Sequence, residues 1–147
     1  RHGSYAVHCP DATNNVIAGI MPTASLHDDG VRLSLGSDVA GGHHVAVYKQ
    51  IAKAIQISKL KEFYEPDGNR SITLENAFFM ATKMGGTAFD RVGSLEPGYR
   101  FNALVIDHVE DEGFPISPEK RLERFCYTGD DRNIVDRFLD GKQVNIS

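Results

Sequence analysis

Cysteine, long apolar runs and blocks of like charge are all scarce in this sequence of 147 residues. No stretch approaches the roughly 18 apolar residues that a membrane span needs, which argues against a membrane protein. Acidic and basic residues are mixed along the chain and the formal net charge is -4, so the sequence carries no nucleic-acid footprint. The two cysteines, Cys9 and Cys126, are far apart in sequence. We therefore expect two reduced thiols in a cytoplasmic protein.

Several common catalytic motifs are missing as well. The absence of Cys-x-x-Cys excludes the cysteine-ligated zinc site of the deaminases that edit nucleic acids. Dinucleotide-binding glycine loops, P-loop lysine motifs and Gly-x-Ser-x-Gly elbows do not occur either. Six histidines are present, and none forms a His-x-His pair.

The most informative stretch is residues 33–42, which read LSLGSDVAGG. An apolar run stops at a glycine, an acid follows, and two more glycines precede a long segment with helical periodicity. This pattern predicts strand, turn and helix, and it places Asp38 at the carboxyl end of a buried strand. Such a carboxylate suits a metal ligand or a general base. The alternative is that Asp38 only caps the next helix or satisfies turn amides.

The segments before this stretch predict an α/β fold. A short strand at residues 4–9 ends at a proline, a loop is expected at residues 11–19, and a helix at residues 23–29 leads to the strand at residues 31–35. Strand, connection and parallel strand form a βαβ unit.

Two helices are expected next. Apolar residues recur at helical spacing from His44 to Leu60, with lysines on the opposite face, so this helix should lie on the sheet. Thr73 should cap a second helix that runs through Met84 and is closed by Gly85 and Gly86.

After Gly93 the sequence becomes rich in strand signals, and we expect a separate layer. We predict a boundary between residues 1–92 and residues 93–147. The predicted elements are a strand at residues 101–106, a helix from Ser117 or Pro118 to about Cys126, and strands at residues 133–140 and 142–146 joined by a tight Asp140–Gly141 turn.

The histidine that matters most is His8, because it ends the first predicted strand as Asp38 ends the next one. Ends of neighbouring parallel strands meet at one rim, so the two side chains could face one site. The alternative is a buried histidine whose nitrogens are satisfied by backbone. His43 and His44 are expected to be mainly solvated, and His27 and His108 to lie on the surface.

Residues 7–10 (VHCP), residues 35–42 (LGSDVAGG) and residues 71–107 together resemble the amidohydrolase superfamily. The ending, residues 127–134 (YTGDDRNI) and 141–144 (GKQV), is similar to the guanine deaminase family within it. The resemblance implies a zinc-dependent enzyme on a (β/α)8 TIM barrel with a small β-sandwich.

In the families it resembles, the zinc ligands are a His-x-His pair, a third histidine and an aspartate after the last strand. Only the aspartate matches here, as Asp38, which the resemblance makes a zinc ligand, a proton carrier and a substrate contact. His8 matches a residue near the substrate that is not a metal ligand. The chain would then be the last two βα units of the barrel plus sandwich strands.

The resemblance also implies a small purine substrate and one zinc ion. The chain begins at Arg1 and resembles only the carboxyl-terminal portion of these enzymes, so we expect it to be inactive alone and to pair with a second copy or with the missing amino-terminal half. The alternatives are another deaminase or chlorohydrolase of the superfamily, or a zinc-free module that serves only binding or assembly.

Overall fold

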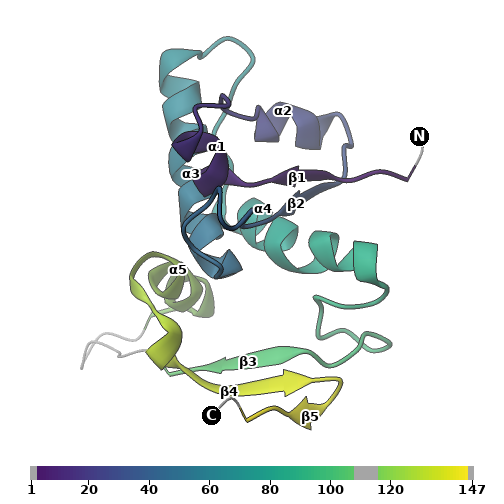
Figure 1. Ribbon diagram of the computed structural model, residues 1–147. Helices are drawn as coiled ribbons and strands as arrows, with labels where there is room; N and C mark the ends of the chain where they lie inside the picture. The colour runs from purple at the N-terminus through teal and green to yellow at the C-terminus, as the bar shows by residue number, and fades with distance from the viewer. Residues whose placement is uncertain (1–2, 108–115, 146–147) are drawn as a thin grey trace.

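The computed structural model describes residues 3–107 and 116–145 and shows a mixed α/β chain with two sheets (Figure 1). Strand β1 (Ala6–His8) pairs in parallel with β2 (Leu33–Leu35), and His8 lies opposite Leu35. Both predicted strands and their parallel pairing are confirmed, although each strand is shorter than its apolar run.

Within the described ranges, no helix is long and apolar enough to cross a membrane.

The connection between β1 and β2 holds two short helices. Helix α2 (Thr23–Asp28) agrees with the prediction, but the loop expected at residues 11–19 is wrong in its first half, where α1 (Pro10–Asn15) forms. Pro10 occupies the first turn of α1, where a missing N–H is harmless and its fixed φ favours the helix. The helix therefore starts directly at the end of β1.

Helix α3 (Val47–Tyr64) is the long helix that packs on the two-stranded sheet, as its periodicity predicts (Figure 1). It starts and ends later than expected. Its buried residues Ile51, Ala54 and Ile55 share one apolar cluster with Leu33 and Leu35 of β2. Burial of the leucine and isoleucine side chains is the main stabilising term for this unit, at about 1.5–3 kcal/mol each.

The next helix departs from the prediction at its end. Thr73 caps α4 (Leu74–Phe79) as expected and accepts a hydrogen bond from the backbone N–H of Asn76. The chain then continues as a π-helix at Met80–Met84, and Gly85 and Gly86 keep helical φ values of -59° and -62° instead of ending it. A Cβ on Gly86 would lie 2.0 Å from the carbonyl oxygen of Val92, so close packing explains that glycine.

A second sheet follows, with the strand order β3–β4–β5 and antiparallel pairing. The predicted strands at residues 101–106 and 133–140, the hairpin turn at Asp140–Gly141 and the helix capped by Ser117 are present in shortened or slightly shifted form. The strand predicted at residues 142–146 forms only at Lys142–Gln143, so the prediction is wrong for positions 144 and 145. Position 146 of the last predicted strand lies outside those residues. The elements are β3 (Ala103–Ile106), α5 (Pro118–Thr128), β4 (Ile134–Leu139) and β5 (Lys142–Gln143).

Helix α5 lies between the second sheet and the βα units (Figure 1). The rings of Phe125 on α5 and Tyr48 on α3 are 4.6 Å apart, and Cys126 is buried in the same apolar cluster as β2. Residues from both sides of the predicted boundary therefore share one core. Cys9 and Cys126 are both free thiols, as predicted.

Candidate functional site

The candidate site lies where β1 and β2 end. The backbone N–H of Gly36 donates to the carbonyl of His8 at 3.0 Å, which extends the strand pairing to the rim of the sheet. Asp38 follows two residues later with a left-handed φ of +47°, and its carbonyl accepts from the N–H of Gly42 at 2.8 Å. The sequence between Leu35 and Gly42 thus forms a turn, and the Asp38 carboxylate is close enough to Cys9, the residue after β1, to affect its thiol.

His8 is almost wholly buried, with 1% of its surface exposed. Its Nδ1 atom has no hydrogen-bond partner among the described residues, so the alternative of a histidine satisfied by backbone is wrong for this nitrogen. Burial lowers the pKa of His8 to about 4. The imidazole is therefore neutral at pH 7, with one ring nitrogen left for a ligand or a water molecule.

Asp38 is close to residues of both βα units. A Cβ added to Gly41 would lie 3.1 Å from Oδ2 of Asp38 and 3.3 Å from Cβ of Ala12 in α1. Burial and the Asp38 carboxylate both raise the pKa of the Cys9 thiol, and they outweigh a backbone hydrogen bond from Gly36 that lowers it. His8 and Asp38 lie at the same end of the sheet, and among the described residues no hydrogen bond joins the Nδ1 atom of His8 to Asp38.

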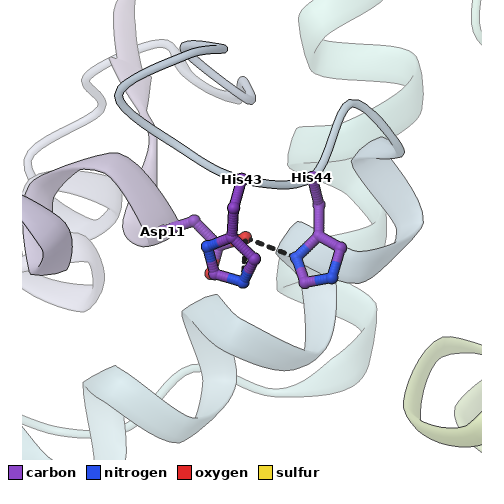
Figure 2. Close-up of side chains that lie close together, drawn as sticks. All are labelled: Asp11, His43 and His44. Atoms are coloured by element: carbon purple, nitrogen blue, oxygen red, sulfur yellow. Dashed lines mark hydrogen bonds and ion pairs between the residues drawn. The ribbon is translucent and has the colours of Figure 1, made fainter.

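The structure adds a cluster that the sequence analysis missed. Asp11, at the start of α1, is buried, and its Oδ2 atom lies 2.9 Å from Nδ1 of His44 and 4.0 Å from Nε2 of His43 (Figure 2). The side chain of Gln50 donates to the same oxygen at 2.9 Å. Lys53 places its Nζ atom 3.8 Å from Oδ1.

The electrostatics of this cluster are dominated by Asp11. Burial alone would raise the pKa of its carboxyl, but the hydrogen bonds from His44 and Gln50 and the nearby charges of His43 and Lys53 outweigh burial and lower it. Asp11 is therefore ionised at neutral pH. The side chains of His43 and His44 are 56% and 44% exposed, so the expected solvation holds, although both rings also face Asp11.

A signal for Asp11 does exist in the sequence. Proline followed by an acid is typical of the first turn of a helix, since the fixed φ and the helix dipole favour both residues. The run of asparagine and threonine after Asp11 instead favours a loop. The contact with His44, 33 positions away, has no local signature.

Helix α1 also holds the turn that carries Asp38. Asn15 donates from its side-chain amide to the carbonyl of Gly41 at 2.8 Å. Gly42 packs so closely that an added Cβ would lie 2.2 Å from the carbonyl of Ser37 and 3.3 Å from Cβ of Asp11. Of the other predicted positions, His27 has a side chain that is 42% exposed, and His108 lies outside the described residues.

Two chemistries are available at this rim. The carboxylate of Asp38 can bind a cation or accept a proton. Asp11, His43 and His44 each offer one ligand atom, and these atoms lie within 4.8 Å of one another. In the part of the chain that the structure describes, Asp38 is not a member of that group.

Comparison with known proteins gives a consistent result. A family model described as "Amidohydrolase family" matches residues 1–144. Guanine deaminase from Rattus norvegicus is 31% identical over 155 residues, a match that covers 97% of this chain and 34% of the rat enzyme.

Solved structures agree with this match. A crystal structure of guanine deaminase from C. acetobutylicum with bound guanine in the active site has a TM-score of 0.87 and 42% identity, covering 95% of this chain and 33% of that one. E. coli guanine deaminase has a TM-score of 0.80 at 21% identity and supports the fold alone. The chain spans about a third of the length of these relatives.

Proposed function

This chain belongs to the amidohydrolase family, and from that premise we propose that it is the carboxyl-terminal part of a zinc-dependent guanine deaminase. The reaction would convert guanine and water to xanthine and ammonia. The observation that carries the proposal is the 42% identity, over 95% of the chain, to a guanine deaminase with bound guanine. The chain spans only about a third of such enzymes, so the activity belongs to the whole polypeptide.

In this proposal β1 and β2 are the last two strands of a (β/α)8 barrel, with α3 on its outside. A barrel of this kind needs eight strands and about 250 residues. Residues 1–92 supply two βα units, and residues 93–147 supply α5 and strands of a small β-sandwich. The parallel pairing of β1 with β2 supports this assignment. The remaining strands come from the rest of the polypeptide, or the open edges pair with a second copy.

Asp38 is the residue that this chain contributes to the zinc site. A catalytic zinc ion needs about three protein ligands, so one carboxylate cannot hold it and the histidine ligands come from the missing part. The position of Asp38 at the carboxyl ends of parallel strands fits this role, since barrel enzymes place their chemistry there. When bound, zinc lowers the pKa of a coordinated water towards about 7.

The Asp38 carboxylate then moves the proton. It accepts a proton from the attacking water and returns it to the departing exocyclic amine of guanine. Asn15 links α1 to this turn through the carbonyl of Gly41, three residues after Asp38. His8, neutral and buried beside the rim, offers its free Nδ1 atom to the purine or to a water molecule bound to it.

The test is Asp38→Asn in the whole protein, with His27→Gln as the matched surface control. We expect guanine turnover to fall by at least about a hundredfold, because a proton carrier typically contributes 10²–10⁴. Full activity in a folded Asp38→Asn protein would contradict the role of Asp38. Turnover of cytosine or an adenosine-type base in place of guanine would favour another deaminase.

Zinc content and the isolated chain complete the test. A whole protein that holds no zinc and no activity would favour a binding or assembly module. We expect residues 1–147 alone to be inactive with guanine, since they supply a single ligand of the zinc site. Activity of the purified 147-residue chain would contradict this expectation.

A further inference from the structure

We propose that Asp11, His43 and His44 form a site for a divalent transition metal, and Asp38 is not a member of this site. Nε2 of His43 and Nδ1 of His44 both point at Oδ2 of Asp11 (Figure 2). The three ligand atoms lie within 4.8 Å of one another. The inference rests on this cluster and goes beyond the proposed deaminase activity.

The distances fit one ion after small side-chain movements. Two metal–ligand bonds of about 2.1 Å at tetrahedral or octahedral angles separate the ligand atoms by about 3.0–3.5 Å. The carboxylate oxygen is 2.9 Å from one imidazole nitrogen and 4.0 Å from the other, values on either side of that range. Two imidazoles and one carboxylate suit Zn²⁺, Ni²⁺ or Fe²⁺ better than Mg²⁺ or Ca²⁺.

An independent observation is the state of the Asp11 carboxylate. Its side chain is only 1% exposed, and its Oδ1 atom accepts no hydrogen bond among the described residues. A buried anion with an unsatisfied oxygen is costly unless positive charge compensates it. The nearby cation, Lys53, stands 3.8 Å away on a side chain that is 36% exposed and can turn to solvent. A metal ion bound at Oδ2 would place a further positive charge directly on this buried carboxylate.

The outer side of the cluster is open. The two histidine side chains are about half exposed, so an ion can enter from solvent and keep water molecules at its remaining positions. Gln50 stays in place as a second donor to Oδ2 and fixes the orientation of the carboxylate. Such support by a neighbour of the ligands is typical of metal sites.

Binding would fix the tautomer of His44. The metal takes the place of the hydrogen between His44 and Asp11, so His44 binds through the lone pair of Nδ1 and carries its ring proton on Nε2. The groups that face the ion are His43, His44, Gln50, Lys53 and Asp11 itself. An ion held here ties α1 to the segment that begins at Asp38, and so stiffens the turn of the proposed active site.

The experiment measures Zn²⁺ stoichiometry and the melting temperature of the whole protein after stripping with a chelator. The test variant is the double substitution His43→Gln, His44→Gln, and the matched control is His27→Gln. We expect wild type and control to bind one more equivalent of Zn²⁺ than the double variant. Added Zn²⁺ should raise the melting temperature of wild type and control by more than it raises that of the double variant. Both histidines are half exposed, so circular dichroism of the variant should remain unchanged.

Asp38→Asn separates this inference from the proposed function. If the extra equivalent survives in Asp38→Asn and disappears in the double variant, this metal site is supported whether or not the protein deaminates guanine. Equal Zn²⁺ stoichiometry in wild type and the double variant would overturn the inference. So would a single equivalent that is lost with Asp38→Asn.

Discussion

The Nδ1 atom of His44 lies 2.9 Å from Oδ2 of Asp11, and this contact joins the segment after Asp38 to the helix that follows β1. Asn15 makes a second link from the same helix to Gly41. Both links are polar, and both bridge the two neighbouring βα units near the carboxyl ends of their strands. The geometry of the Asp38 turn is therefore set by side chains of α1 as well as by its own glycines.

Replacing Asp11 with asparagine tests this connection. The Asp11→Asn side chain keeps the shape but loses the charge that faces His43, His44 and Lys53, so we expect the free energy of unfolding at pH 7 to fall by about 1–3 kcal/mol. Urea denaturation in the presence of a chelator measures it. Asp29→Asn, at an exposed position, is the control and should change stability by less than about 0.5 kcal/mol. Equal stability of the Asp11 and Asp29 variants would mean that the contact does not hold the two units together.

Burial of His8 predicts a pH dependence of stability. Its pKa is about 4 in the folded chain and about 6.5 when unfolded, so the unfolded state binds the extra proton between these values. Stability is complete above about pH 6.5 and falls as the pH drops towards 4, by at most about 3 kcal/mol. Urea denaturation from about pH 4 to pH 8 should show this loss in wild type and in His27→Gln. The loss should be smaller in His8→Gln. If the unfolding free energy of His8→Gln fell with pH as steeply as that of wild type, His8 would not be the cause of the loss.

The parts of the fold that the sequence predicts are those with local signals. Strand β2, helix α3 and the hairpin after Ile134 each have a clear period or a turn residue, and all are present. Helix α1 is not predicted because its sequence, PDATNN, favours loops. Its contacts to Gln50 and Gly41 are tertiary and leave no pattern in the chain.

The same distinction applies to the candidate site. His8 and Asp38 could be selected because each ends an apolar run, and their functional roles stay predictions. The cluster of Asp11 with His43 and His44 could not be predicted from the sequence, because it depends on how α1 packs against the segment before α3. At Gly85 and Gly86 a local signal gave a wrong prediction. A glycine pair usually ends a helix, but here the two glycines stay helical and allow close packing.

Two glycines next to Asp38 should differ sharply in their tolerance of alanine. At Gly42 the added Cβ would meet the backbone carbonyl of Ser37 at 2.2 Å, and a backbone atom cannot move away without opening the turn. At Gly36 the added Cβ would lie 2.8 Å from a side-chain atom of Val7 and 3.1 Å from one of Cys9. Both of these side chains can rotate away. We expect Gly42→Ala to cost at least about 2 kcal/mol of unfolding free energy and Gly36→Ala about 1 kcal/mol or less. Thermal denaturation of the two variants side by side measures the difference, and the reverse order would contradict the structure of the turn.

The contact between α3 and α5 determines whether residues 1–92 and 93–147 unfold separately. Phe125 is 6% exposed and stacks against Tyr48, so Phe125→Ala should lower the free energy of unfolding by about 3–5 kcal/mol. Phe89→Ala, at a side chain that is 74% exposed, is the control and should have little effect. Circular dichroism during urea denaturation measures both variants.

The thiol of Cys126 reports on the same contact, because it follows Phe125 in α5. Burial raises the pKa of Cys126 to about 11, so it should resist alkylation by iodoacetamide while α5 is docked. If Phe125→Ala speeds alkylation of Cys126 and lowers the midpoint of the whole unfolding transition, the two parts share one cooperative core. If alkylation rises while the helical signal of α3 persists to the wild-type midpoint, α5 detaches alone. The boundary near residue 92 would then separate two units that fold independently.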